Sequence, residues 1–188
     1  MKKALLILIS ILFISPLFAA DEKPGRFFED QPDVTDDYQI HFIYLIPNDG
    51  EDRELDINGK MEKTLLEMNE VMFEATKANK GSGGIGKKYK FDYRKDGKLD
   101  ITFIRTSKNW KELKDKSVNT QIGNYFHQVG GFTNKKKTYF LWTDVNKGDQ
   151  SGDAGVGFGG IFVRSNGVSV GNRLITINLH ELLHTQLM

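Results

Sequence analysis

The sequence predicts a single α/β (α+β) domain, in which a mixed β-sheet is backed by a long helix and a second helix lies at the C-terminus. The apolar run 38–47 contains β-branched and aromatic residues and ends at a proline, which is typical of a buried strand. The stretch 61–72 has no glycine or proline and carries apolar residues at three- and four-residue spacing, which is typical of a helix that covers a sheet. The aliphatic stretch 175–183 predicts the C-terminal helix.

The long helix is expected to cover about twenty residues, from a cap at Asn58 to a stop at Gly81. Its apolar stripe is interpreted as core rather than as a cofactor-binding surface, and consists of Met61, Leu65, Met68 and Met72.

Further elements are expected between the two helices. In chain order they are a hairpin over 89–106, a short helix over 120–129, a strand over 137–145, a glycine-rich loop over 147–160 and a strand over 161–165. The hairpin is predicted because Asp96-Gly97 favours a tight turn. The last helix is expected to begin at Asn172 or Asn178, since asparagine caps helices well.

Residues 1–19 are predicted to be a secretory signal peptide. Lys2 and Lys3 precede an uncharged apolar run, and the small residues Ala19 and Ala20 follow it. A transmembrane anchor is the alternative, because the apolar run approaches the length that spans a bilayer. A signal of this kind predicts a secreted or periplasmic protein of a bacterial envelope.

The remaining chain is expected to contain one functional unit. Residues 20–37 are acidic and contain proline, so a flexible lead-in is expected there, and residues 38–188 are expected to form the domain. A net charge of +1 gives no electrostatic reason to expect nucleic acid or an anionic membrane as a partner. The absence of cysteine means that no disulfide supports the exported protein.

Two stretches resemble ligand-binding motifs and are interpreted otherwise. GSGGIGKK (81–88) nearly matches a phosphate-binding loop, but it follows a helix and leads into a strand, and Lys88 replaces the serine or threonine that would hold magnesium. DVNKGDQSGD (144–153) is rich in oxygen ligands, so a structural Ca²⁺ site stays open as an alternative to a solvated turn. The calcium candidates are Asp144, Asn146, Asp149 and Asp153.

The C-terminal stretch carries an H-E-x-x-H pattern at residues 180–184. Residues four apart lie on one face of a helix, so His180 and His184 can bind one metal ion through their ring nitrogens. Glu181 is turned by about 100° from His180, which places its carboxylate near the metal without making it a ligand. That arrangement suits a general base that takes a proton from water as it attacks a carbonyl.

ITINLHELLHTQ (175–186) resembles the active-site helix of zincin metallopeptidases, especially the H-E-L-x-H-T form of secreted bacterial members. The expected order of strand, long backing helix, further strands, glycine-rich edge region and zinc helix is also similar. The likeness covers most of 38–186 as topology, and only 180–185 as a specific motif. It implies a zincin-like mixed sheet, zinc bound by His180 and His184, Glu181 as general base, and hydrolysis of peptide bonds.

The sequence departs from that family in the third zinc ligand, because a catalytic zinc usually has three protein ligands. In the metzincin branch the motif continues to a glycine, where this chain has Leu187, and to a third histidine that would fall beyond residue 188. In the gluzincin branch the third ligand is a glutamate on a later helix. We therefore expect a truncated version of a longer protein. The alternative is an upstream ligand, for which the candidates are His41, His127, Asp144, Asp149 and Asp153.

The function expected from these residues is zinc-dependent hydrolysis of a peptide or protein substrate, with Glu181 as base and His180 and His184 as metal ligands. The alternative is a non-catalytic exported binding protein, in which the motif is degenerate or accidental.

Overall fold

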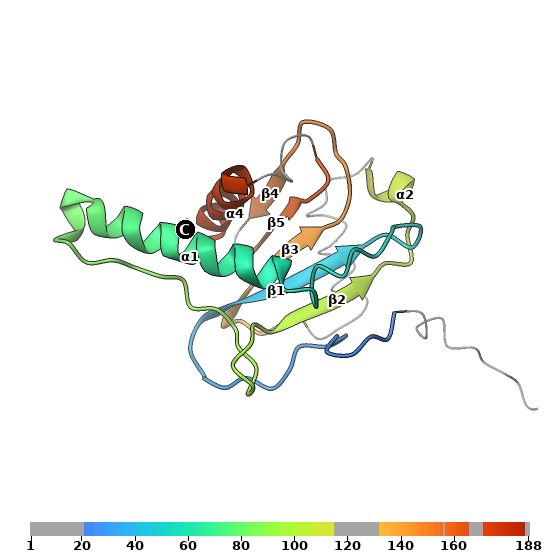
Figure 1. Cartoon of the computed structure of the whole chain (residues 1–188), viewed down its shortest axis with the longest axis horizontal. Coiled ribbons are helices and arrows are strands. Elements are labelled where there is room, and N and C mark those ends of the chain that lie inside the picture. The colour runs from blue at the N-terminus through green and yellow to red at the C-terminus, as the bar shows by residue number, and fades with distance from the viewer. Residues whose placement is uncertain (1–20, 115–131, 156, 166–170, 187–188) are drawn as a thin grey trace, which may run out of the picture.

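A five-stranded sheet forms the centre of the protein, in the order β2-β1-β3-β5-β4 (Figure 1). The structure is a computed structural model that describes residues 21–114, 132–155, 157–165 and 171–186. The strands are β1 (Gln39–Ile46), β2 (Ile101–Arg105), β3 (Lys137–Thr143), β4 (Gly152–Gly155) and β5 (Phe158–Phe162). The helices are α1 (Lys60–Ala78), the short 3₁₀ helix η1 (Lys80–Ser82), α2 (Trp110–Lys114) and α4 (Gly171–Gln186). The expected mixed α/β architecture is confirmed.

The sheet is parallel except at one edge. β1 pairs in parallel with β2 and with β3, and β3 pairs in parallel with β5, whereas β4 runs antiparallel to β5. All eight residues of β1 are buried. A parallel strand covered on both faces needs a continuous apolar run, which is why β1 was recognisable in the sequence.

Helices α1 and α4 lie on the same face of the sheet (Figure 1). Met61, Leu65 and Met68 of α1 are fully buried, and Leu182 is the fully buried contribution of α4. They pack against the side chains of β1 and β3 that point to this face, among them Phe42. The methionine stripe is therefore core, as the sequence predicts, except that Met72 is only partly buried.

Helix α1 is not capped at Asn58 as expected. Its N-cap is Gly59, at φ 80°, which makes no side-chain cap bond, and Asn58 lies one residue earlier, where its Oδ1 accepts a hydrogen bond from the Lys60 amide at 3.0 Å. The helix ends at Ala78, before the expected stop at Gly81, and Asn79 leads directly into η1.

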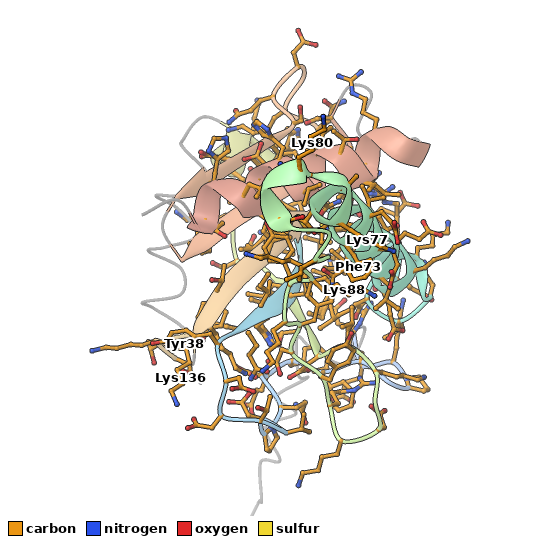
Figure 2. The ribbon with its side chains drawn as sticks, turned by 90° about the vertical axis from the view of Figure 1, so that its left-hand side faces the viewer. Tyr38, Phe73, Lys77, Lys80, Lys88 and Lys136 are labelled. Atoms are coloured by element: carbon orange, nitrogen blue, oxygen red, sulfur yellow. The ribbon has the colours of Figure 1, made fainter. Side chains whose placement is uncertain are left out.

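The stretch that resembles a phosphate-binding loop packs against the end of α1. A side chain at Gly86 would overlap the ring of Phe73, so this position allows close approach of the backbone to the helix. The ammonium groups of Lys77 and Lys88 lie 5.6 and 5.2 Å from the centre of the same ring (Figure 2). These contacts account for glycine and lysine here without a nucleotide.

Two expected elements form differently. The Asp96-Gly97 turn is present, with Gly97 at φ 81°, but the arm before it makes only single bridges, and β2 after it pairs in parallel with β1. The expected glycine-rich loop contains β4, and β5 begins at Phe158 rather than at Ile161. Glycine-rich strands lack the branched and aromatic side chains by which strands are recognised, so tertiary pairing overrides their low propensity.

Residues 20–37 are expected to be a flexible lead-in, and the described residues 21–37 make specific contacts with the rest of the domain. The Phe27 carbonyl accepts a hydrogen bond from the Phe103 amide at 2.8 Å, which places the segment along the outer edge of β2. The buried guanidinium of Arg26 donates to Asp52 and Asp56 at 2.7 to 3.1 Å, and lies 3.8 Å from the centre of the Phe103 ring. Ion pairs and backbone bonding thus cover an edge that would otherwise be exposed.

The predicted signal peptide and the predicted helix over 120–129 lie outside the described residues. In the described ranges, none of the helices combines the length and apolarity that a membrane span requires.

The ion pairs of the N-terminal segment predict acid-sensitive stability. Burial by itself would raise the pKa of Asp52, but hydrogen bonds from Arg26, the Glu54 amide and Lys23 hold that pKa well below its ordinary value. A carboxylate with a lowered folded-state pKa stabilises the fold fully above its unfolded pKa of about 3.9, and this contribution falls progressively as the pH drops from that value toward the folded-state pKa. We expect Asp52→Asn to lower the free energy of unfolding by about 2–3 kcal/mol at pH 7 and by a smaller amount at pH 3.

Urea unfolding at the two pH values measures the difference. Asp36→Asn is the control, because the Asp36 side chain is 94% exposed and its ion pair with Lys136 lies at the surface. A loss of stability in Asp52→Asn that does not depend on pH would contradict the electrostatic explanation.

Candidate active site

The C-terminal helix α4 starts at Gly171, so Asn172 lies close to the helix start and the alternative start at Asn178 is wrong. Asn178 is buried inside the helix. Its Oδ1 accepts a hydrogen bond from the indole Nε1 of Trp142 on β3 at 2.8 Å, and its Nδ2 donates to the Leu174 carbonyl at 2.8 Å. This side chain fixes α4 to the middle of the sheet.

Two glycines allow α4 to approach the edge strands closely. A methyl group at Gly152 of β4 would lie 2.6 Å from Cγ and 2.7 Å from Oε1 of Glu181. A methyl group at Gly159 of β5 would lie 2.8 Å from Cγ2 of Thr185. The glycine-rich stretch of the sequence is thus the surface on which α4 rests, and this role was not evident before the structure.

The two histidines of the motif converge on one point. The Nε2 atoms of His180 and His184 lie 3.1 Å apart, and their rings are nearly perpendicular, with centroids 4.6 Å apart. Two nitrogens bound to one zinc ion at 2.0–2.1 Å with tetrahedral angles would be about 3.3–3.4 Å apart. The observed separation therefore fits a shared metal ion after a small adjustment. Both imidazoles are exposed, on the side of α4 that faces away from the core.

Glu181, next to His180 in sequence, lies against the edge strand β4. Its side chain is partly buried against Gly152. Burial raises the pKa of the Glu181 carboxyl above its ordinary value, His180 and His184 oppose that shift, and Asp153 adds to it. The two imidazoles thus lie on one face of α4, with the Glu181 side chain against β4, and their roles as metal ligands and general base stay predictions.

The candidates for a third ligand do not join this pair among the described residues. A metal site needs at least three ligand atoms close together. Among the described His, Cys, Asp and Glu residues, one group has three or more ligand atoms within 4.8 Å of one another, and it consists of Asp30, His41, Asp92 and Asp100. His41 therefore belongs to a separate cluster, and neither Asp149 nor Asp153 approaches both His180 and His184 at this distance. His127 lies outside the described residues.

Asp144 is engaged elsewhere, in a buried ion-pair network. Its carboxylate accepts hydrogen bonds from Arg53 at 2.5 and 2.8 Å, from Arg164 at 2.6 Å and from the Tyr44 hydroxyl at 2.7 Å. Two guanidinium groups leave this carboxylate unsuited to a cation. For the same reason Asp144 is not available as a ligand of the predicted Ca²⁺ site.

Comparison with known proteins identifies distant structural neighbours only. No protein-family model and no curated protein matches the chain. Among solved structures, it is similar to wild-type OgpA from Akkermansia muciniphila in two crystal forms. One has 11% identity, a TM-score of 0.49 and coverage of 86% of this chain and 50% of that chain. The other has 8% identity, a TM-score of 0.42 and coverage of 71% and 36%.

The chain is also similar to a catalytically inactive OgpA in complex with an O-glycopeptide (glycodrosocin) substrate. The identity is 10%, the TM-score is 0.45, and 61% of this chain and 33% of that chain are covered. This chain thus spans half or less of the length of these proteins. The function proposed below is argued from the residues of this chain.

The bond between Asn178 and Trp142 predicts a measurable loss of stability. Asn178→Ala leaves the buried indole N–H without its acceptor, which costs about 1–3 kcal/mol. Chemical unfolding, followed by near-ultraviolet circular dichroism, should report both the loss and the changed environment of Trp142. Arg173→Ala, at an exposed position of the same helix, is expected to change stability by less than about 0.5 kcal/mol. An equal loss in both variants would show that helix propensity, rather than this bond, determines the cost.

Proposed function

We propose that this protein is a zinc-dependent hydrolase of peptide bonds, with His180 and His184 as metal ligands and Glu181 as general base. The observation that carries the proposal is the 3.1 Å separation of the two Nε2 atoms on one helix face, beside a carboxylate held on an edge strand. The likeness of residues 175–186 to the zinc helix of zincins supports the same assignment.

The pair supplies two of the three protein ligands that a catalytic zinc usually has. We propose that the third ligand comes from outside the described residues, where His127 is one candidate. Zinc titrations of His127→Ala and His184→Ala test this, because loss of a true ligand should weaken binding in both variants to a similar degree.

Each motif residue has a defined task in this proposal. Zinc bound to the two imidazoles would supply Lewis acidity, which lowers the pKa of water toward neutrality. Glu181 accepts a proton from the attacking water and can return it to the leaving amine. Its side chain lies against Gly152 of β4, which limits the freedom of the carboxylate on the side of the sheet.

The edge strand offers a surface for an extended substrate. β4 is the last strand in the sheet order, and its pairing with β5 uses one of its two edges. An extended peptide can add to such an edge through backbone hydrogen bonds, which position it without requiring a particular sequence. Because Gly152 of β4 contacts Glu181, a peptide bound along β4 would pass close to the proposed base.

The second candidate is an exported binding protein that does not catalyse hydrolysis. It is favoured by one observation, namely that no third ligand accompanies His180 and His184 among the described residues. In either case we propose that residues 1–19 direct export and that the mature protein is secreted or periplasmic. Hydrolysis of an unfolded protein in the presence of stoichiometric zinc separates the two functions.

Glu181→Gln should keep zinc and lose activity. The amide has nearly the size of the carboxylate but cannot accept the proton, so we expect hydrolysis of unfolded casein to fall by about 10²- to 10⁴-fold. Bound zinc, measured by mass spectrometry of the metal, should stay at the level of the parent protein. Glu74→Gln, on the exposed surface of α1, is the matched control and should leave both quantities unchanged. Full activity in Glu181→Gln would remove Glu181 from the mechanism.

Gly152→Ala should affect catalysis more than stability. The added methyl group would overlap Cγ as well as the carboxylate of Glu181, so the whole side chain must rotate away from β4. We expect at least a tenfold loss of kcat with a change in Tm of no more than a few degrees. Gly155→Ala lies on the same strand and has no atom within 4 Å of the added methyl group, so it should retain activity. Equal activity of the two variants would contradict the proposed position of Glu181.

A further inference from the structure

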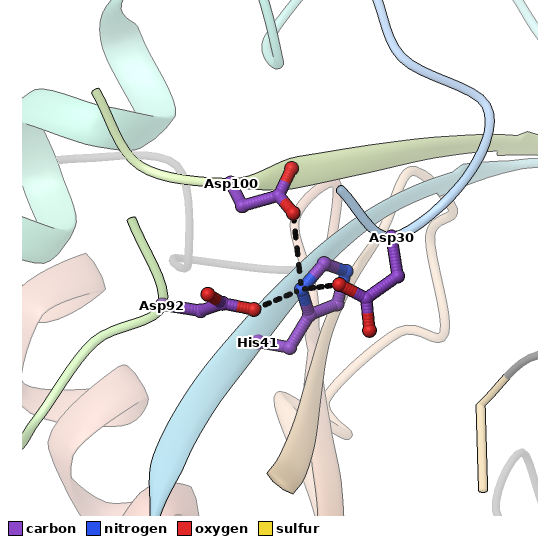
Figure 3. Close-up of side chains that lie close together, drawn as sticks. All are labelled: Asp30, His41, Asp92 and Asp100. Carbon is purple, nitrogen blue, oxygen red and sulfur yellow. Dashed lines mark hydrogen bonds and ion pairs between the residues drawn. The ribbon is translucent and has the colours of Figure 1, made fainter. Parts of the chain in front are cut away.

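A second group of potential metal ligands lies at the beginnings of β1 and β2, on the other face of β1 from α1 and α4. It consists of Asp30, His41, Asp92 and Asp100, which we call the sheet-face cluster (Figure 3). Each residue offers one ligand atom, and all four atoms lie within 4.8 Å of one another. The ring of His41 contacts Tyr139 and Phe132, which places it on the face that carries the second apolar core.

The cluster is organised around one nitrogen of a buried imidazole. The Nδ1 of His41 is 2.9 Å from Asp92 Oδ2, 3.6 Å from Asp30 Oδ1 and 3.9 Å from Asp100 Oδ2 (Figure 3). Its Nε2 is 2.9 Å from the Thr102 hydroxyl. Without an ion, Nδ1 donates a hydrogen bond to Asp92 Oδ2. Because the Thr102 hydroxyl can also accept, the proton can move to Nε2 when a cation takes the place of that hydrogen bond at Nδ1. A hydrogen bond to the far ring nitrogen is a general feature of histidines that bind metal.

The charges of the cluster are not balanced by the described side chains around it. The Lys137 ammonium lies 2.6 Å from carboxylate oxygens of Asp30, Asp33 and Asp92. With a neutral imidazole and four ionised carboxylates, three negative charges would be unmatched by the one ammonium. Burial, together with Asp92 and Asp30, raises the pKa of the Asp100 carboxyl, which shows that ionising all four without a further cation is unfavourable. The side chains of Asp92 and Asp100 are each only 1% exposed, so water screens this charge weakly.

Two buried oxygens in the same carboxylates also lack a hydrogen-bond partner. They are Asp92 Oδ1 and Asp100 Oδ1. The other oxygen of Asp100 accepts a hydrogen bond from the Gln31 amide at 2.7 Å. Buried carboxylates without enough hydrogen bonds or cations are costly, and a bound metal ion removes that cost.

We propose that the sheet-face cluster is a binding site for a divalent transition-metal cation, separate from the pair on α4. The ligands are Nδ1 of His41 and carboxylate oxygens of Asp30, Asp92 and Asp100. The Lys137 ammonium lies 2.6 Å from Asp30 Oδ1 and Asp92 Oδ2 in the structure, so binding of the ion requires it to move away from these oxygens and to pair with Asp33 alone. A mixed set of imidazole and carboxylate favours Zn²⁺ or Mn²⁺ over Mg²⁺ and Ca²⁺, which prefer oxygen ligands alone.

The cluster joins parts of the chain that are far apart in sequence. Asp30 belongs to the N-terminal segment, His41 to β1, Asp92 to the arm before the turn, and Asp100 directly precedes β2. A cation bound there holds the N-terminal segment against the sheet, and its binding free energy stabilises the folded state. The role is therefore structural rather than catalytic.

The experiment uses a background in which the pair on α4 has been removed, His180→Ala/His184→Ala. After treatment with a chelator, Zn²⁺ or Mn²⁺ is added, unbound metal is removed by gel filtration, and bound metal per chain is measured together with Tm. We expect close to one bound ion per chain and a higher Tm with the metal than without it. No bound ion in this background would overturn the proposal, and would show that Lys137 serves as the cation of the cluster.

Two further variants in the same background make the assignment specific. Asp100→Asn should fold, because it removes a buried charge, and should bind the ion at least tenfold more weakly. Asp96→Asn changes an exposed carboxylate in the turn between Asp92 and Asp100, and should bind like its parent. Equal affinity in both variants would exclude Asp100 as a ligand. A rise in Tm with Ca²⁺, and none with Zn²⁺ or Mn²⁺, would overturn the assignment to a transition metal.

Discussion

The close approach of α4 to the edge strands is the constraint on which the rest of the proposed site depends. Gly152 and Gly159 carry no side chain where Glu181 and Thr185 lie against the sheet, and Leu182 between them is fully buried. The hydrogen bond from Trp142 to Asn178 sets the position of the helix along β3. With one face of α4 held in this way, helical geometry directs His180 and His184 away from the sheet and toward solvent.

The opposite edge of the sheet is held by charge rather than by close packing. There Arg26 and Arg105 pair with Asp52, Asp56 and Asp21. At the start of the central strand β3, Lys137 pairs with three further carboxylates, two of which, Asp30 and Asp33, belong to the N-terminal segment. A chain without cysteine has no covalent link to fasten its N-terminal segment. Buried ion pairs hold the N-terminal segment in place through directional hydrogen bonds between charged groups. The stability of this segment therefore depends on pH and, in our proposal, on a bound metal ion.

The elements predicted well are those whose signal is local. β1 is apolar along its whole length because both of its faces are covered, and α1 is amphipathic because one face packs on the sheet. β4 and the start of β5 were missed because glycine has low strand propensity, and these strands form only by pairing. The N-terminal segment was expected to be flexible because it is acidic and contains proline. In the structure Arg26 and Asp21 pair with residues far along the chain, which composition does not reveal.

The sequence by itself determined the mixed α/β class, the helix that carries the motif, and the convergence of His180 and His184, because helical spacing alone brings residues four apart together. Tertiary structure decided what surrounds them. It placed Glu181 against Gly152, assigned Asp144 to two arginines, and gathered Asp30, His41, Asp92 and Asp100 into one buried cluster. These contacts join residues distant in sequence through strand pairing and helix packing, and no local pattern of side chains specifies which distant partners will meet.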